Sequence, residues 1–496
     1  MSTTDTATDE VIEEHNAATR RAVAWLAGFI TVGTLIRIPQ LWHGLNEMHA
    51  FRQTQTTFVA LEYARRGINL LHTPLPIFGP NSDVPMEFPL VQAMAAVLIR
   101  LGVGPDTAMR IVGLAGFQAA AILLAVLVLR WHGRLATIVV LALYEFSPFG
   151  LAWGAAALID FPAVAFSLGM VVGLDAWFRG GSRTGLVLGA MSAWLAFLVK
   201  ATTPPAWCVL VLVSAAAAYV TARSWRRIIA GFVAGPIPGV AVGLWWARYA
   251  DAVKNRNPLT QFLTSASLKD WNFGTLGQRL DPGAYGPVFL RVSSEIAGPL
   301  ALGLIFAVVG IALAVTRVDR LRRAGWLATA VAAPLLFFNL YHVHNYYLIG
   351  IFPAIIAAVG IGIAAVAQRI RANPAFVAAA GTALIVVGSA LPQSDMLQWV
   401  RSPVPNPGGE RIRAATNTDD LIVTVGCDWD PTTLYFADRH GLMLRDKKLD
   451  VWKYQNINDY RYLFSCDQAL PVGTYVPAGH TLIPTSEPGL WRITNS

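Results

Sequence analysis

Charged residues are scarce in this sequence. Asp, Glu, Lys and Arg make up 14% of its 496 residues, whereas ordinary soluble domains contain about 25%. The hydrophobic content is correspondingly high, at 55%, with a mean hydropathy of +0.49. A water-soluble protein cannot bury that much apolar surface. The composition therefore excludes a soluble enzyme and a disordered chain, and indicates an integral membrane protein.

Cysteine is rare as well. Three cysteines exclude a disulfide scaffold and a zinc ribbon. Cys208 lies in an apolar stretch, where we expect it to be a small core residue. Cys427 and Cys466 both lie in the last hundred residues. A disulfide between them would form in an oxidising compartment, and the sequence leaves this and two free thiols open.

Apolar stretches long enough to cross a bilayer, roughly 17–25 residues, recur along the chain and predict about 11 spans. These stretches are 22–41, 107–129, 135–152, 161–178, 184–200, 204–222, 228–248, 295–315, 324–341, 346–367 and 374–391. Residues 1–21 are polar and acidic, and no small-residue cleavage site follows them. We therefore expect the first stretch to be an uncleaved signal anchor.

Arginine marks one side of the predicted bundle. Arginine-rich connections between spans belong inside the cell, and they are 130–134, 179–183, 223–227, 317–323 and 369–371. This places residues 1–21 in the cytoplasm and the C-terminus outside, provided that the shorter apolar stretch 88–102 does not cross. We predict an interfacial or re-entrant helix there, within a long first outer loop, 42–106. The net charge of +8 is then largely a topology signal and indicates no nucleic-acid partner.

The last hundred residues differ from the rest because their polar spacing is that of a water-exposed domain. Segments 419–426, 432–437 and 490–494 are predicted to be strands bounded by turn formers. We predict a small α/β domain over 392–496 on the outer face.

Charges outside the arginine connections are functional candidates, because an ionisable group in a span costs about 2.5–3.5 kcal/mol at mid-helix. The densest group follows the first span. There Glu47 is suited to act as general base towards an acceptor hydroxyl, and Arg52 to hold a phosphate by two parallel hydrogen bonds. His49, Gln53 and Gln55 stand in the same segment. The alternative is an amphipathic interfacial helix with solvated polar residues.

Three more ionisable groups belong to the outer side. Glu87, between Pro85 and Pro89, is equally compatible with a site role and with a carboxylate at a helix N-terminus. Asp160 opens a span, where it would cap the helix, bind substrate, or both. Lys200 ends a span on the side without arginines. A cation there suits an anionic ligand, and the alternative is that it snorkels to lipid headgroups.

A histidine and tyrosine cluster lies between two late spans, at residues 341–347. His342 and His344 form a His-x-His pattern, but no Cys or carboxylate is near in sequence, and two ligands do not make a zinc site. These histidines and Tyr347 would equally donate hydrogen bonds to a phosphate, or Tyr347 would belong to an aromatic belt. The sequence assigns no cofactor and leaves the participation of a divalent metal open.

Acids and cations thus converge on one face from at least four separate loops. An anionic, membrane-embedded donor with an uncharged acceptor would require this arrangement. A lipid-linked phosphosugar fits it, with the tail among the spans and membrane lipids and the phosphate at Arg52 and Lys200.

Residues 49–56 (HAFRQTQT) are similar to an H-A-W/F-R-Q-x-x-T segment of the GT-C superfamily of integral-membrane glycosyltransferases. The branch is that of the protein mannosyltransferases and the lipid A aminoarabinose transferases (glycosyltransferase family 39). The other matches, in chain order, are Phe88-Pro89-Leu90, Arg110, Asp160-Phe161-Pro162, Phe197-Leu198-Val199-Lys200, and Tyr346-Tyr347-Leu348 with Pro353. The resemblance covers about 22–391, which it implies is a catalytic transmembrane domain.

The resemblance implies inverting transfer of a sugar from a polyprenyl phosphate to an envelope glycan, lipid or protein at the outer face of the cell membrane. Glu47, or Asp160 as second choice, would be the base; where the family often has Asp, this chain has Glu47. Arg52, Lys200 and His344 would stabilise the leaving phosphate. A transporter or flippase of lipid-linked sugars is the competing hypothesis, and it predicts inverted repeats that the sequence does not show. A membrane scaffold would not require these acids and cations.

Overall fold

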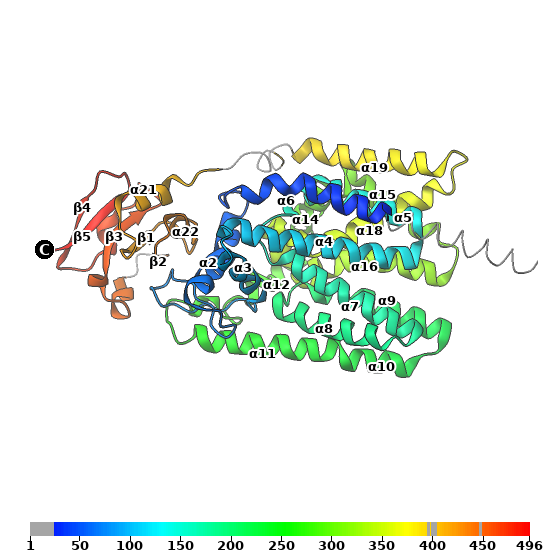
Figure 1. Cartoon of the computed structure of the whole chain (residues 1–496), viewed down its shortest axis with the longest axis horizontal. Coiled ribbons are helices and arrows are strands. Elements are labelled where there is room, and N and C mark those ends of the chain that lie inside the picture. Colours follow the sequence, from blue (N-terminus) through cyan, green and yellow to red (C-terminus); the bar gives the residue numbers. More distant parts are fainter. Residues whose placement is uncertain (1–23, 394–396, 398–403, 446–448) are drawn as a thin grey trace, which may run out of the picture.

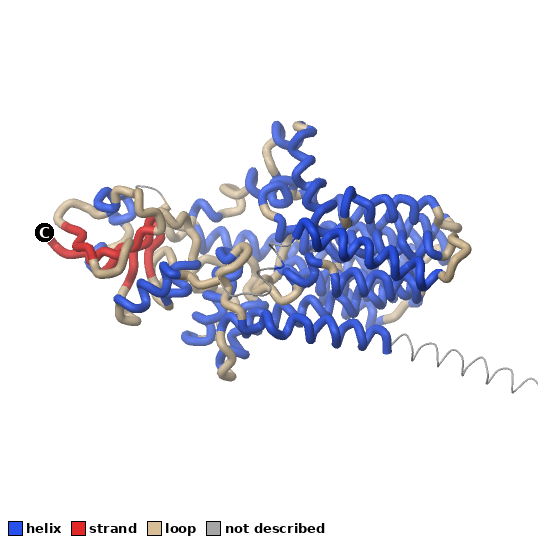
Figure 2. The backbone as a smooth tube through the Cα atoms, turned by 90° about the horizontal axis from the view of Figure 1, so that it is seen from above, coloured by secondary structure: helices blue, strands red, loops and turns tan. Residues whose placement is uncertain are grey.

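The computed structural model describes residues 24–393, 397, 404–445 and 449–496. A long bundle of helices carries a small sheet at one end (Figure 1), and a second view shows the same division into a helical body and a strand-containing cap (Figure 2). The predicted tail 1–21 lies outside the described residues, and so does most of the connection between bundle and cap.

Within the described residues, five helices are long and apolar enough to cross a membrane, and a helix pair bent by 88° is a sixth candidate. They are Ala24–Trp42, α4 (Pro105–His132), α7 (Asp160–Gly180), α9 (Pro204–Ala222), α10 with α11 (Trp225–Lys254), and the pair Pro282–Ala297 and Pro299–Ala312. Shorter or more polar helices complete the bundle: α5 (Arg134–Phe146), α6 (Pro148–Trp153), α8 (Arg183–Val199), α16 (Arg317–Leu336), α18 (Phe352–Ala367) and α19 (Pro374–Ala390). Over the described residues, the stretches predicted to span are largely helical, some with a break. The count of about 11 crossings stays a prediction.

Small residues allow close helix contacts, as is common in membrane bundles. A Cβ atom on Gly173 of α7 would lie 2.6 Å from the carbonyl oxygen of Gly185 in α8. A Cβ atom on Gly310, in the second half of the bent pair, would lie 2.7 Å from the Cα of Gly362 in α18. A larger residue at either position would force the two backbones apart.

A buried ion pair fixes the first helix to α5. The Arg37 Nη1 atom lies 3.0 Å from Glu145 Oε2, and both side chains are fully buried. Arg37 also donates to the carbonyl oxygens of Gly33 at 2.7 Å and Glu145 at 2.8 Å, and it lies over the Phe117 ring. The guanidinium is therefore paired on several sides in an apolar setting.

The arginine connections gather at the end of the bundle away from the sheet. Arg130 and Arg179 both lie within 4 Å of the Asp175 carboxylate. Trp177 Nε1 donates to the carbonyl oxygen of Arg227 at 2.7 Å. The turn between α18 and α19 lies at the same end (Figure 1). The structure therefore separates a basic end from the end with the sheet, and the assignment of the basic end to the cytoplasm stays a prediction.

The first outer loop folds between the bundle and the sheet, where α2 (Ala50–Arg66) and α3 (Leu90–Arg100) lie (Figure 1). α3 has 11 residues, which is about 16 Å at 1.5 Å per residue. The hydrocarbon core is about 30 Å thick. The helix within 88–102 is too short to cross, as the arginine pattern requires.

The C-terminal domain is a five-stranded sheet with the order β2-β1-β3-β5-β4. The strands are β1 (Leu421–Val425), β2 (Gly441–Leu444), β3 (Tyr460–Ser465), β4 (His480–Pro484) and β5 (Leu490–Asn495), with α21 (Pro407–Ala415) and α22 (Thr432–Ala437) beside them. β1 is parallel to β2 and β3, and β5 is antiparallel to β3 and β4. The predicted strands at 419–426 and 490–494 are confirmed.

The predicted strand at 432–437 is wrong, because this segment is the helix α22. Its threonine and aromatic residues favour a strand on propensity alone. However, the segment connects the parallel strands β1 and β2, and such a connection has to cross over the sheet, usually as a helix. The Asp430 carboxylate also accepts a hydrogen bond from the Thr432 N–H at 2.8 Å, which starts the helix.

Cys427 and Cys466 form a disulfide, with their Cα atoms 5.2 Å apart. Of the two alternatives that the sequence left open, the structure has the bridge. It joins the segments that follow β1 and β3, two adjacent parallel strands.

Backbone hydrogen bonds attach the sheet to the first outer loop. β2 is an edge strand, and such an edge presents unpaired N–H and C=O groups. Here Gly441 N–H donates to the carbonyl oxygen of Pro76 at 2.9 Å, Met443 N–H to Ile77 at 2.8 Å, and Gly79 N–H to Gly441 at 3.0 Å. The loop therefore covers the edge of the sheet.

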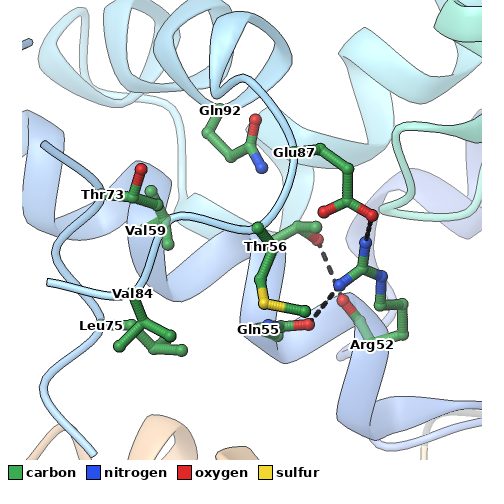
Figure 3. A pocket seen from close by; sticks show the side chains of 10 residues that line it. Arg52, Gln55, Thr56, Val59, Thr73, Leu75, Val84, Glu87 and Gln92 are labelled. Carbon is green, nitrogen blue, oxygen red and sulfur yellow. Dashed lines mark hydrogen bonds and ion pairs between the residues drawn. The ribbon is translucent and has the colours of Figure 1, made fainter. Parts of the chain in front are cut away.

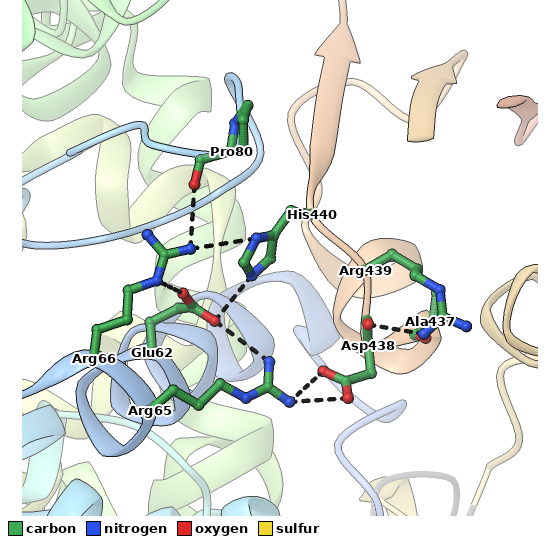
Figure 4. Close-up of polar contacts among 8 residues, drawn as sticks. All are labelled: Glu62, Arg65, Arg66, Pro80, Ala437, Asp438, Arg439 and His440. Carbon is green, nitrogen blue, oxygen red and sulfur yellow. Dashed lines mark hydrogen bonds and ion pairs between the residues drawn. The ribbon is translucent and has the colours of Figure 1, made fainter. Parts of the chain in front are cut away.

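A charged network forms a second contact between this domain and α2 (Figure 4). The buried Glu62 lies 3.0 Å from His440 Nε2 and 2.7 Å from Arg66 Nε. Arg65 contacts Glu62 and pairs with Asp438 at 2.7 Å. Burial raises the pKa of Glu62, but His440 and the two arginines outweigh it, so the net pKa lies below the ordinary value. Glu62 is therefore held as a carboxylate.

Removal of the disulfide is expected to loosen the C-terminal domain. The bridge spans 39 residues, and closing a loop of that length stabilises a fold by about 3–4 kcal/mol in the chain-entropy description. The double variant Cys427→Ser/Cys466→Ser should lose resistance to proteolysis within 404–496 at a lower temperature than the parent chain. Cys208→Ser is the control. Equal melting of the double variant and the parent would contradict this expectation.

The contact around Glu62 is expected to weaken in acid. Because the folded pKa of Glu62 is below its ordinary value of 4.5, its contribution is fully present above pH 4.5 and is lost as the pH falls through the lowered value. Hydrogen exchange at β2 should accelerate in that range. Glu62→Gln should accelerate it already at pH 7, whereas the exposed control Asp419→Asn should not. Unchanged exchange in Glu62→Gln would refute the role of the carboxylate.

Candidate active site

The start of α2 brings the residues of the first predicted cluster together. His49 precedes the helix in the left-handed region, with φ 53°. This conformation is uncommon for a residue with a Cβ atom and is found disproportionately at functional sites. The chain turns there, so that Glu47 lies before the turn while Arg52, Gln53 and Gln55 follow on the helix.

The Glu47 carboxylate is oriented by two donors. Its Oε1 atom accepts a hydrogen bond from Arg110 Nη2 at 2.7 Å and another from Gln53 Nε2 at 3.1 Å. Gln53 Oε1 in turn accepts from the Ala157 N–H at 2.9 Å, which ties the carboxylate to the loop before α7. The Glu47 side chain is 15% exposed. It is therefore fixed in position and still reachable.

Arg52 forms an ion pair with Glu87 and donates to Gln55 Oε1 at 2.5 Å (Figure 3). Burial raises the pKa of Glu87, but the charge and hydrogen bond of Arg52 outweigh it, and the net pKa lies below the ordinary value. Glu87 precedes α3, which begins at Leu90. The alternative of a carboxylate at the N-terminus of that helix is wrong, because the N-cap is Pro89 and the first turn has no acidic residue.

Asp160 and Lys200 form a buried pair. Lys200 Nζ lies 2.5 Å from Asp160 Oδ1, and the side chains are 4% and 1% exposed. Asp160 is the first residue of α7, but Ile159 is the N-cap and no side-chain cap bond forms, so the capping role is wrong. The snorkelling alternative for Lys200 is wrong too, because its ammonium lies 4.9 Å and 5.3 Å from the ring centres of Tyr347 and Tyr346.

His49 belongs to a chain of hydrogen bonds. Its Nε2 atom lies 2.9 Å from Asn345 Oδ1, and Asn345 Nδ2 donates to Glu295 Oε2 at 3.1 Å. The bond from Asn345 Nδ2 to Glu295 fixes the orientation of the Asn345 amide, so Asn345 Oδ1 faces His49. His49 therefore carries its proton on Nε2, which leaves Nδ1 as an acceptor. Burial lowers the pKa of His49. Burial also lowers the pKa of His344 to about 4. The ring of His344 meets that of His49 edge-on, with the ring centres 5.1 Å apart. Both imidazoles are therefore neutral at pH 7.

Three acid–cation pairs lie at the end of the bundle that the C-terminal domain covers, and we call them the outer cluster. They are Glu47–Arg110, Arg52–Glu87 and Asp160–Lys200. Lys200 also lowers the pKa of Glu87, which makes the second and third pairs neighbours. The domain lies directly over α2, where the Trp429 and Phe51 rings meet edge-on at 4.5 Å.

His342 is the one predicted site residue that lies apart from the others. Its Nδ1 atom lies 3.1 Å from the carbonyl oxygen of Ala284, and its ring stacks on Phe338. His342 and His344 therefore face different surroundings and do not share a ligand. Over the described ranges, no group of three or more His, Cys, Asp or Glu side chains is placed to hold a metal ion.

Two residues of the site, Glu295 and Asn345, were not assigned from the sequence, and Arg110 was noted only as a family match. Arg110 and Glu295 each stand alone at the start of an apolar stretch. An isolated ionisable group in that position is the signal that could have found them. Glu295 lies in a short π-helix, Val292–Ala297, a form that often occurs at functional sites.

No family model and no curated protein matches the sequence, but solved structures do. ArnT from Cupriavidus metallidurans bound to undecaprenyl phosphate has a TM-score of 0.64 at 13% identity, over 95% of this chain and 98% of that one. Its apo form gives 0.62 at 14% identity over the same shares. The oligosaccharyltransferase AglB from Archaeoglobus fulgidus, in complex with an inhibitory peptide and a dolichol-phosphate, gives 0.52 at 11% identity, over 89% of this chain and 69% of that one. The chain has the fold of these proteins, and the predicted helical membrane bundle with a small C-terminal α/β domain is confirmed, while the number of spans stays a prediction.

Asp160–Lys200 is the most buried pair of the outer cluster, and breaking it is expected to destabilise the bundle. Lys200→Met leaves Asp160 buried and without its cation, a change that typically costs about 3–5 kcal/mol. Thermal unfolding in detergent should show a clear loss of stability. The double variant Lys200→Met/Asp160→Asn should recover part of it, and the exposed control Lys269→Met should show none. A Lys200→Met variant as stable as the parent would contradict the pairing.

Proposed function

We propose that the chain is a membrane glycosyltransferase that moves a sugar from a polyprenyl-phosphate donor to a glycan, lipid or protein of the cell envelope, with inversion. The observation that carries the proposal is the oriented Glu47 carboxylate beside buried cations at the end of a GT-C bundle. The neighbouring ArnT structure holds undecaprenyl phosphate and the AglB structure a dolichol-phosphate, which supports a lipid-phosphate donor here.

Glu47 is the favoured base, and Asp160 is the second choice. Glu47 takes the proton of the acceptor hydroxyl while the hydroxyl oxygen attacks C1 of the sugar. The bond between C1 and the phosphate oxygen breaks on the opposite face, and polyprenyl phosphate leaves. The accessible position of Glu47 favours it over Asp160, which is 1% exposed and held by Lys200.

Arg52 and Lys200 supply positive charge where the phosphate leaves, and His344 supplies a hydrogen bond. Each cation already has an acid partner, which holds it in place before substrate arrives. Donors fixed in advance stabilise a developing charge without reorganisation. Arg110 and Gln53 are positioning residues, since both act through Glu47.

The orientation follows from the arginine pattern and the site. The outer cluster and the C-terminal domain lie at the end without the arginine connections, which we place outside the cell membrane, with residues 1–21 in the cytoplasm. Transport of a lipid-linked sugar is the alternative. The bent pair Pro282–Ala297 and Pro299–Ala312 resembles the broken helices of transporters, but these occur in corresponding positions of two repeats. The described chain has one such pair, which favours transfer.

Glu47→Gln is expected to abolish sugar transfer, because an amide cannot take the proton. The loss should be about 10²–10⁴-fold, measured in membranes with a radiolabelled polyprenyl-phosphate sugar and an envelope extract as acceptor. Expression should stay intact, and the exposed control Glu410→Gln should keep full activity. Full activity in both Glu47→Gln and Asp160→Asn would overturn the assignment of the site.

A further inference from the structure

One short helical segment holds the loop at residues 341–345 with two side chains. Arg291 directly precedes the π-helix that contains Glu295. Arg291 Nη1 donates to two carbonyl oxygens of the loop, at 2.7 Å and 3.1 Å. Glu295 Oε2 accepts a hydrogen bond from Asn345 Nδ2 at 3.1 Å. The segment therefore fixes both the backbone of the loop and the side chain at its end.

The carboxylate of Glu295 decides which way the Asn345 amide faces. A carboxylate only accepts hydrogen bonds, so it takes the NH₂ group of the amide and leaves the amide oxygen to His49. The reversed amide would bring two accepting oxygens together and lose this bond. Because Asn345 Oδ1 also only accepts, His49 carries its proton on Nε2, which lies 2.9 Å away. Glu295 thus sets the tautomer of His49 through one intervening side chain.

The second ring nitrogen of His49 is open to a ligand. Nδ1 forms no hydrogen bond within the part of the chain that the structure describes, and it is not fully buried. Burial lowers the pKa of His49, so at pH 7 this nitrogen presents a lone pair. An ionised phosphate offers only oxygens that accept, and it has no partner there. A hydroxyl group donates its proton to a lone pair and therefore fits.

His49 lies next to the groups that we assign to the leaving phosphate. The centres of the His49 and Tyr346 rings are 4.8 Å apart, and Lys200 Nζ lies 5.3 Å from the centre of the same Tyr346 ring. A ligand at His49 Nδ1 is therefore a near neighbour of a phosphate at Lys200. The donor sugar is bonded to that phosphate, so its hydroxyls are the donating groups closest to hand. An ammonium group would donate as well, but Lys200 disfavours a second cation beside it.

We infer that Glu295 is a positioning residue, which acts through Asn345 to hold His49 ready to accept a hydrogen bond from a hydroxyl of the transferred sugar. The inference rests on the proposed function and deepens it, because it assigns His49 to the sugar and not to the phosphate. It also gives the π-helix a task in the site: the segment fixes the loop by its backbone and the tautomer of His49 by its carboxylate.

The test moves the carboxylate along the chain of hydrogen bonds. Glu295→Gln removes the charge at nearly constant size, so the Asn345 amide can face either way. The double variant Glu295→Gln/Asn345→Asp restores the parent's net charge and places a carboxylate directly against His49, where only the Nε2 proton satisfies it. Ser294→Ala, one residue away in the π-helix, is the control. Thermal unfolding shows which variants fold, and Asn345→Ala, which cuts the link from the other side, carries the test if Glu295→Gln does not.

Two measurements are made on the full chain. Nitrogen NMR of the ¹⁵N-histidine-labelled protein in detergent reports the tautomers of its nine histidines, and the signals of His49 are identified by their loss in His49→Gln. The spectra are recorded at pH 8, which keeps His49 neutral beside the new carboxylate of the double variant. Sugar transfer to an envelope extract is measured in membranes with radiolabelled polyprenyl-phosphate mannose, glucose and arabinose in turn.

We expect His49 to carry its proton on Nε2 alone in the parent chain, on either nitrogen in Glu295→Gln, and on Nε2 alone again in the double variant. The KM for the donor lipid should rise about threefold in Glu295→Gln, because only the fraction with a free Nδ1 binds the hydroxyl, and about tenfold in His49→Gln. The double variant and Ser294→Ala should keep the parent's KM.

An unchanged tautomer in Glu295→Gln would overturn the role of Glu295. A changed tautomer with an unchanged donor KM, or with a higher KM for the envelope extract instead, would overturn the assignment of the sugar hydroxyl. A parent chain that transfers none of the three sugars would count against the proposed function, and the NMR spectra would still decide the role of Glu295.

Discussion

A charge buried among apolar helices has to meet an opposite charge, because the desolvation of a single ion costs several kcal/mol. Four such buried ion pairs stabilise the structure described above. Arg37–Glu145 fixes the first helix to α5, and Glu47–Arg110 joins the first outer loop to α4. Arg52–Glu87 holds two parts of the first outer loop together, and Asp160–Lys200 joins α7 to the end of α8. In each pair the two residues are distant in sequence, so every pair also works as a tertiary contact. The cost of burying a charge therefore explains both why charged residues are scarce in this chain and why the buried ones occur in pairs.

The same pairing sets the chemistry. In the outer cluster three acids face three cations, and the group as a whole carries no excess charge. In the proposed reaction, an approaching phosphate would meet cations that are already desolvated, and it would partly replace the carboxylates as their partner. Glu47 differs from Asp160 in its exposure and not in its partner's charge, and in the proposed reaction this difference favours Glu47 as the reacting acid.

The sequence predicts composition-driven features well and pairings poorly. The spans, the arginine end and the short helix within 88–102 follow from hydropathy and charge, which are local properties. The partner of Asp160 is Lys200, 40 residues later, and nothing near either residue reveals it, so a cap was the natural local reading. The helix at 432–437 was missed for a related reason: its conformation depends on the parallel pairing of β1 with β2, a long-range fact. The unassigned Asn345 became part of the site only through contacts with His49 and Glu295.

The contact between β2 and residues 76–79 has a consequence for biosynthesis. The first outer loop is made before the strand that covers it, which follows much later in the chain. Until then the loop that leads to Thr73 and Glu87 lacks its backbone partner, and α2 lacks the domain that lies over Phe51. A chain truncated before β2 would insert its helices and still present an unfinished site. The first outer loop is thus held by a strand far away in the sequence, so a change confined to the C-terminal sheet reaches the segment that carries Glu87.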